Sequence, residues 1–121
     1  MPSLSFKSQF AGLVQTGKKT QSIRAPRKRP FKVGDTLYLF TAMRTKQCRQ
    51  IGEGEVTEIK QVRIKGGFIW VDERGLTFAE ATAFAIADGF PGVSSLIHWF
   101  REQHGLPFTG ALIRWRLRTA P

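Results

Sequence analysis

The chain has 121 residues, of which 19 are lysine or arginine and 9 are aspartate or glutamate, giving a formal net charge of +10. This length fits one domain, residues 1–121, with one hydrophobic core, and the single cysteine, Cys48, excludes an intramolecular disulfide. No apolar run is long enough to cross a bilayer and the first residues do not resemble a signal peptide, so we expect a cytoplasmic protein without membrane contact.

The positive charge is concentrated in one segment. Residues 18–49 hold ten lysines and arginines and one acid, Asp35, so this segment carries 10 − 1 = +9. A clustered field of one sign attracts polyanions, and nucleic acid is the obvious one, whereas charge that serves only solubility would be spread more evenly. The candidate nucleic-acid-binding residues are Lys18, Arg24, Arg27, Lys28, Arg29, Arg44, Lys46, Arg114 and Arg116.

The first part of the chain predicts a strand and a short helix. Leu4 and Phe6 alternate with polar residues, which is typical of a half-buried strand. Apolar residues spaced by three and four over residues 8–15 predict a helix, which Ser8 can cap and which Gly17 ends.

The next segments predict strands separated by basic loops. Residues 20–24 read as a short strand, and residues 25–30 form a basic loop that two prolines stiffen. A Gly-Asp turn leads into a buried strand at residues 37–40, and residues 44–49 are the tip of a hairpin.

The second half changes its hydrophobic period twice. Residues 54–64 predict a long strand with a bulge near residues 59–61, and the Gly66-Gly67 pair predicts a hairpin turn to residues 68–71. A capping box from Thr77 to Glu80 begins one helix, and Ser94 or Ser95 caps a second that ends near residue 104.

The last strand, at residues 111–118, alternates apolar residues with three arginines. An outward arginine row is either a solvated face or a track for phosphates, and the sequence leaves both readings open. Five or six strands, a short early helix and two helices before the last strand indicate an α+β protein with a small mixed barrel.

The segment from Gly17 to Arg24 carries the candidate chemistry. A hydroxyl near a lysine is the minimum for an activated nucleophile, and an arginine can hold an anion. From residue types alone, a solvated basic loop explains the same segment. Lys19 and Ser22 would lie on opposite faces of a regular strand, so they converge only if the chain turns between them.

Four motifs resemble the ASCH domain, a member of the PUA-like barrel superfamily, and they follow one another along nearly the whole chain. They are Gly17-x-Lys19-x-x-Ser22-x-Arg24 with Phe10 before it, Lys-Val-Gly-Asp at residues 32–35, Ala-Asp-Gly-Phe at residues 87–90 with the helix after it, and Phe-Thr-Gly at residues 108–110.

The resemblance implies a barrel whose cleft is lined by residues 17–24, in a family associated with RNA and modified nucleosides. Some members hydrolyse the acetyl amide on the exocyclic amine of cytidine. The family pattern makes Lys19 the proton acceptor, Ser22 the nucleophile and Asp88 the proton donor. Two residues depart from that pattern, since serine replaces threonine and aspartate replaces glutamate.

The sequence therefore predicts a monomer that binds RNA or a modified pyrimidine nucleotide, with amidohydrolase activity on an acylated cytidine as its enzymatic reading. A non-catalytic RNA-binding module and a ribonuclease are the alternatives. His98 and His104 lack the cysteine or histidine partners of a metal site, so we expect no metal and no cofactor.

Overall fold

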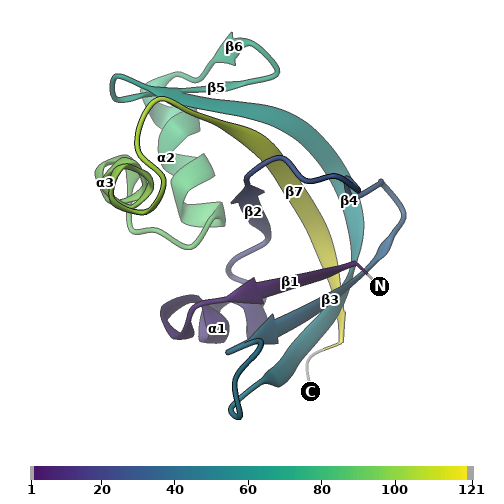
Figure 1. Cartoon of the computed structure of the whole chain (residues 1–121). Helices are drawn as coiled ribbons and strands as arrows, with labels where there is room; N and C mark the ends of the chain where they lie inside the picture. The colour runs from purple at the N-terminus through teal and green to yellow at the C-terminus, as the bar shows by residue number, and fades with distance from the viewer. Residues whose placement is uncertain (1, 120–121) are drawn as a thin grey trace.

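Two long antiparallel strands, β4 (Arg49–Lys65) and β7 (Phe108–Thr119), form the centre of the sheet. In the computed structural model, which describes residues 2–119, both strands are strongly curved (Figure 1). The short strand β2 (Gln21–Arg24) pairs antiparallel with β7. This pairing places β2 at one edge of the sheet.

The remaining strands extend β4 at its two ends. At its beginning, β3 (Thr36–Thr41) pairs antiparallel with β4, and β1 (Ser3–Phe6) pairs parallel with β3. At its end, β5 (Phe68–Val71) and β6 (Arg74–Gly75) continue a meander. The sheet thus has seven strands within residues 2–119, one or two more than the sequence predicted, while the α+β class is confirmed.

The three helices lie on the concave side of the arc that β4 and β7 make (Figure 1). α1 (Ser8–Gln15) lies near β1 and β3, and α2 (Phe78–Ala87) and α3 (Val93–Gln103) lie near the other end of the arc. β2 runs between these two groups of helices. The beginning of β2 is therefore enclosed by α1 on one side and α2 and α3 on the other.

The predicted helix ends are correct in part. The capping box is present, because the Thr77 hydroxyl accepts from the Glu80 N–H and the Glu80 carboxylate accepts from the Thr77 N–H. The other two capping predictions are wrong, since Lys7 precedes α1 and Gly92 precedes α3, and neither makes a side-chain cap.

The predicted bulge in β4 is real but lies two or more residues earlier. Thr57 has no partner in β7, because the register shifts between Val56 and Glu58. The extra residue lets Val56 pair with Trp115 and Ile59 pair with Ile113, so apolar side chains meet on both sides of the bulge.

The core fills the space between the curved sheet and the helices. Its side chains come from every layer, and those with almost no exposed surface include Leu37, Leu39, Ile51, Leu96, Phe100 and Leu112. The sheet stays open at β1 and β2, which are not paired with each other within residues 2–119. The Arg24 side chain spans this opening, and its Nη2 donates to the Ser5 carbonyl at 2.9 Å.

Candidate functional site

A left-handed glycine directs the chain into the site. Gly17 follows α1 with a φ of 77°, a value that favours glycine. The N–H groups of Lys18 and Lys19 both donate to the Leu13 carbonyl, at 2.9 and 3.0 Å, so the chain turns sharply before β2 begins. The Thr20 N–H then donates to the Ala87 carbonyl at 3.0 Å. This bond ties the turn to the end of α2 and brings Lys19 to Asp88.

Lys19 and Asp88 form a buried ion pair. Both residues are 3 % exposed, and Lys19 Nζ lies 3.4 Å from Asp88 Oδ2 while also donating to the Asp88 backbone carbonyl. Burial lowers the pKa of the Lys19 ammonium from 10.5 to about 8 and raises the pKa of the Asp88 carboxyl from 3.8 to about 6. The attraction between the two charges opposes both shifts. The pair therefore stays charged at neutral pH, while the pKa of each group lies closer to neutrality than in water.

Glycine is required beside this pair. Gly89 has a φ of 96°, and a Cβ there would lie 3.1 Å from both Lys19 Cδ and Phe10 Cδ1. A larger residue would thus strain the backbone and also push against the Lys19 side chain. The Ala-Asp-Gly-Phe motif of the sequence combines an acid that ends α2 with the turn that accommodates the lysine.

Gln21 is a site residue that sequence reasoning missed. It is fully buried, and its Nε2 lies 3.3 Å from Asp88 Oδ1 and 3.4 Å from the Phe84 carbonyl. Its Oε1 accepts from Arg114 Nε at 3.2 Å, which fixes the orientation of the amide because the guanidinium only donates. The one available signal was a glutamine on the same strand face as Ile23, where an apolar residue is expected.

Ser22 and Arg24 form the other half of the site. Arg24 Nε donates to Ser22 Oγ at 2.8 Å, and the guanidinium lies 5.0 Å from the centre of the Phe6 ring. Burial lowers the pKa of Arg24, and the Asp88 carboxylate opposes this shift. A guanidinium bonded to the serine oxygen stabilises negative charge that develops there.

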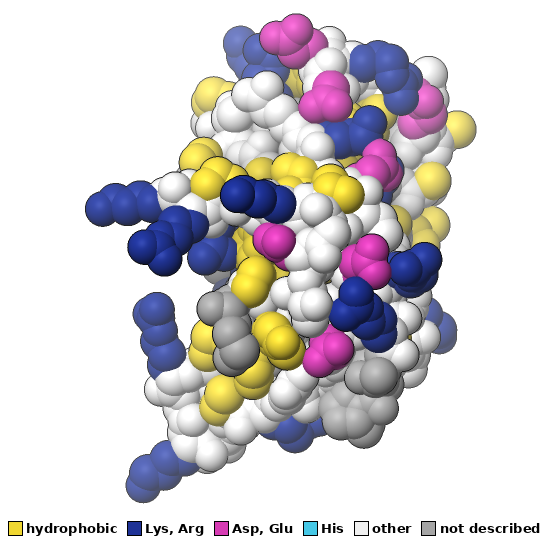
Figure 2. Space-filling model, turned by 90° about the vertical axis from the view of Figure 1, so that its right-hand side faces the viewer, with side chains coloured by type: hydrophobic (Ala, Val, Ile, Leu, Met, Phe, Trp, Pro, Cys, Tyr) yellow, Lys and Arg dark blue, Asp and Glu magenta, His cyan; other side chains and the backbone are white. Residues whose placement is uncertain are grey.

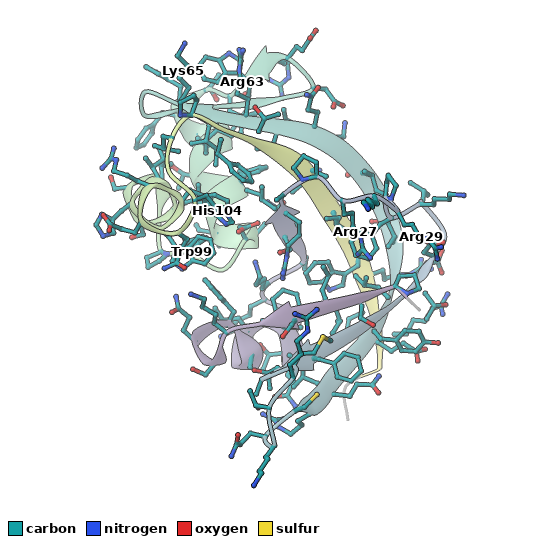
Figure 3. The ribbon with its side chains drawn as sticks, viewed as in Figure 1. Arg27, Arg29, Arg63, Lys65, Trp99 and His104 are labelled. Carbon is teal, nitrogen blue, oxygen red and sulfur yellow. The ribbon has the colours of Figure 1, made fainter. Side chains whose placement is uncertain are left out.

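One cavity of about 170 Å³ brings these groups together. Lys19, Ser22, Arg24 and Asp88 all line it, so the three residues that the resemblance picked out do converge, as the turn after Gly17 requires. Its other walls are largely aromatic, from Phe6, Phe10, Phe90, Trp99, Phe100 and His104. Trp99 belongs to α3 and His104 directly follows it, and their ring centres are 5.9 Å apart (Figure 3). A polar floor with aromatic walls suits a planar polar heterocycle.

Of the predicted nucleic-acid-binding residues, only Arg24 lines the cavity within residues 2–119. Arg24 lines it, whereas the candidates that are exposed in loops do not: Lys18, Arg27, Lys28, Arg29, Arg44 and Lys46. Figure 3 shows Arg27 and Arg29 on the loop that follows β2. In Figure 2 lysine and arginine side chains project from one edge of the molecule, while elsewhere on this face basic and acidic side chains are interspersed.

The arginine row of β7 is paired with glutamates of β4. Arg114 Nη1 lies 2.8 Å from Glu58 Oε1, and Arg116 Nη2 lies 3.3 Å from Glu55 Oε1. Their registers in the two strands are directly opposite. Arg114 also donates to Gln21, so for Arg114 the structure favours a solvated, ion-paired face over a track for phosphates. Arg116 stays largely exposed.

Residues 2–119 offer neither a cluster of metal ligands nor a membrane-spanning helix. Within residues 2–119 no three histidine, cysteine, aspartate or glutamate side chains gather in a way that would hold a metal ion. Over the same range the helices are too short or too polar to traverse a bilayer.

The comparisons with known proteins identify the fold. No family model and no curated protein matches the chain in sequence. The structure is similar to the crystal structure of the ASCH protein from Zymomonas mobilis, with a TM-score of 0.62, 14% identity, and coverage of 98% of this chain and 68% of that one. Crystal structures of two mutants of the same protein give TM-scores of 0.60 and 0.61 at 15% and 14% identity, covering 98% of this chain and 70% and 68% of theirs. The resemblance to the ASCH domain is thus confirmed at the level of the fold.

Proposed function

We propose that the protein binds RNA or a modified pyrimidine nucleotide at this cavity and hydrolyses the amide of an acylated cytidine there. The observation that carries the proposal is the buried Lys19–Asp88 pair in one cavity with the Ser22 hydroxyl. A lysine whose pKa is lowered toward neutrality can act as a base, whereas an exposed lysine with an ordinary pKa stays protonated at neutral pH.

The pair supplies a base and an acid through one proton transfer. Between the two pKa values, about 6 and about 8, the pair holds one ammonium and one carboxylate. Moving one proton across the 3.4 Å contact gives a neutral amine on Lys19 and a protonated carboxyl on Asp88. In this form Lys19 accepts the proton of Ser22, and Asp88 donates one to the leaving group.

The reaction then follows the ordinary course of acyl transfer. Ser22 Oγ attacks the carbonyl carbon of the acyl group, and the tetrahedral intermediate collapses as the bond to the exocyclic nitrogen breaks. The nitrogen leaves as an amine with the proton from Asp88. Water then hydrolyses the ester on Ser22, which releases a carboxylic acid and restores the hydroxyl. Arg24 stabilises the serine oxygen through its 2.8 Å hydrogen bond.

A non-catalytic RNA-binding module is the second candidate, and one observation favours it. The serine oxygen is bonded to Arg24, while Lys19 Nζ is bonded to the carbonyl and carboxylate of Asp88. In this arrangement both groups already have partners, as they would in a site that only binds. A ribonuclease would use the same cations to activate a ribose hydroxyl, and it is distinguished by its products.

The test is hydrolysis of cytidine acetylated on its exocyclic amine, followed by chromatography of the released cytidine. We expect activity with an optimum between pH 6 and 8, because below this window Lys19 stays protonated and above it Asp88 has no proton to give. Lys19→Ala should abolish the activity, while Lys65→Ala, a change at an exposed lysine that does not line the cavity, should not. Full activity of Lys19→Ala would remove the mechanism, and RNA binding without turnover would favour the second candidate.

A further inference from the structure

A second, larger cavity adjoins the site. Its volume is about 390 Å³, and it lies between the loop that follows β2 and the strands β4 and β7. The two cavities share Arg24 and Ala25 among their lining residues, so they meet at the end of β2. We call the larger one the loop groove. Thr109 and Gly110 of the Phe-Thr-Gly motif line it, but of the residues in the catalytic proposal only Arg24 does.

The floor of the loop groove is apolar and its rim is charged. Pro26, Pro30 and Phe31 form one wall, and Ile59 and Ala111 come from the two strands. The charged residues of the groove are Arg24, Arg27, Lys60 and Asp72, which sum to 3 − 1 = +2. Lys60 Nζ lies 3.7 Å from Asp72 Oδ2 and 3.5 Å from Glu58 Oε2, so acids engage Lys60. Within residues 2–119 neither Arg24 nor Arg27 forms an ion pair; Arg27 is exposed, whereas Arg24 is half-buried and already donates to Ser22 and Ser5.

The size of the site cavity argues that its ligand extends beyond it. Pockets for small ligands usually occupy about 300 Å³ or more. The site cavity, at about 170 Å³, holds a base but not a whole nucleotide with its neighbours. A ligand that leaves the cavity past Arg24 enters the loop groove, where apolar surface and positive charge lie side by side.

Arg27 shows how the groove wall can serve a base. Its guanidinium lies 4.3 Å from the centre of the Phe31 ring, which holds a flat cationic surface on the exposed loop. Bases stack on guanidinium and aromatic planes without much regard to sequence, and phosphates pair with the same cations. Two neighbouring prolines limit the conformational freedom of the loop.

We propose that the loop groove binds the nucleotide adjacent to the one in the site cavity, so that the substrate is an RNA strand and not a free nucleoside. This inference rests on the proposed function, because it assumes that the site cavity takes a pyrimidine base. The phosphate that links the two nucleotides lies near Arg24, at the junction of the two cavities. An acidic or proline-rich peptide is the competing occupant.

The experiment compares two probes on the same variants. The probes are cytidine acetylated on its exocyclic amine and a short oligoribonucleotide that carries one such cytidine. Ala111→Leu fills the groove floor, and Ala111 lines only the larger cavity of the two. We expect this variant to weaken binding of the oligoribonucleotide about tenfold, as the loss of one stacked base does, and to leave binding of the nucleoside unchanged.

Two further variants keep the test decisive. Ala79→Leu adds the same side chain on the exposed surface of α2 and should change neither affinity. Arg27→Gln alters only the exposed loop and leaves the core packing intact, so it serves as the test if Ala111→Leu does not fold. It should weaken binding of the oligoribonucleotide more than binding of the nucleoside. Equal affinity of wild type and both groove variants for the oligoribonucleotide would overturn the inference and leave a peptide as the occupant to test. Absence of binding by either probe would overturn the proposed function as well.

Discussion

The change Asp88→Asn isolates the charge of the buried pair. The amide has nearly the same shape as the carboxyl, and its oxygen can still accept from Gln21 Nε2, which lies 3.3 Å from Asp88 Oδ1. Its nitrogen then faces Lys19 Nζ, so two donors meet where an ion pair was. Lys19 keeps the backbone carbonyl of residue 88 as a partner but loses its counter-charge.

The expected cost is large at neutral pH. Breaking a buried pair by removing one partner leaves an uncompensated charge and costs about 3–5 kcal/mol of the free energy of unfolding. The cost falls with rising pH, because the pKa of Lys19 already lies near 8 and drops further without the carboxylate that raises it. Once Lys19 is neutral in the folded state, no buried charge is left unpaired. We therefore expect a loss of about 3 kcal/mol at pH 6 and a much smaller one at pH 9.

The measurement is urea unfolding of wild type and variant at both pH values. Asp72→Asn is the matched control, because its ion pair with Lys60 is exposed and should contribute less than about 1 kcal/mol at either pH. Equal stability of Asp88→Asn and wild type at pH 6 would refute the reasoning, as would a deficit that stays constant up to pH 9. Either result would mean that Lys19 is not held as a cation by Asp88.

Three further outcomes are expected. Gly110→Ala should lower the melting temperature, because the new Cβ would lie 2.4 Å from the Arg24 carbonyl oxygen and overpacking costs about 1–3 kcal/mol. Gly12→Ala in α1 should raise the melting temperature, because the new Cβ meets nothing within 4 Å and alanine favours the helix. Gln21→Leu should raise the pKa of Asp88 above its wild-type value in a carboxyl NMR titration, because the hydrogen bond from Gln21 lowers that pKa; an unchanged or lower value would contradict the role given to Gln21. RNA affinity should fall steeply and linearly on a log–log plot against salt, and a flat line would exclude binding through phosphates.

Local patterns in the sequence predicted most of the fold. The capping box before α2, the glycine turn after α1 and the double-glycine hairpin each depend on residues close together in the chain. The two wrong caps have the same origin. Ser8 and the serines of residues 94–95 are residue types that favour the capping position, but Lys7 and Gly92 occupy that position, one or more residues earlier.

Features that depend on register between distant strands could not be predicted. Glu58 faces Arg114 only because the bulge at Thr57 shifts β4 against β7. Without that shift Thr57 would face Arg114, so the sequence could not assign the partner of this arginine and left the reading of the row open. Gln21 was missed for a related reason, since its partners Asp88 and Arg114 lie 67 and 93 residues later in the chain.

The Arg24 side chain joins β1 to β2, so the guanidinium that we propose as a phosphate ligand also connects these two strands. Its N–H groups are committed to Ser5 on one strand and Ser22 on the other. A phosphate arriving at this position has to compete with those two acceptors for the same donors. A bound phosphate and the contact between β1 and β2 would therefore use the same Arg24 hydrogen-bond donors. We expect phosphate binding to weaken the contact and to raise the rate of amide hydrogen exchange in β1.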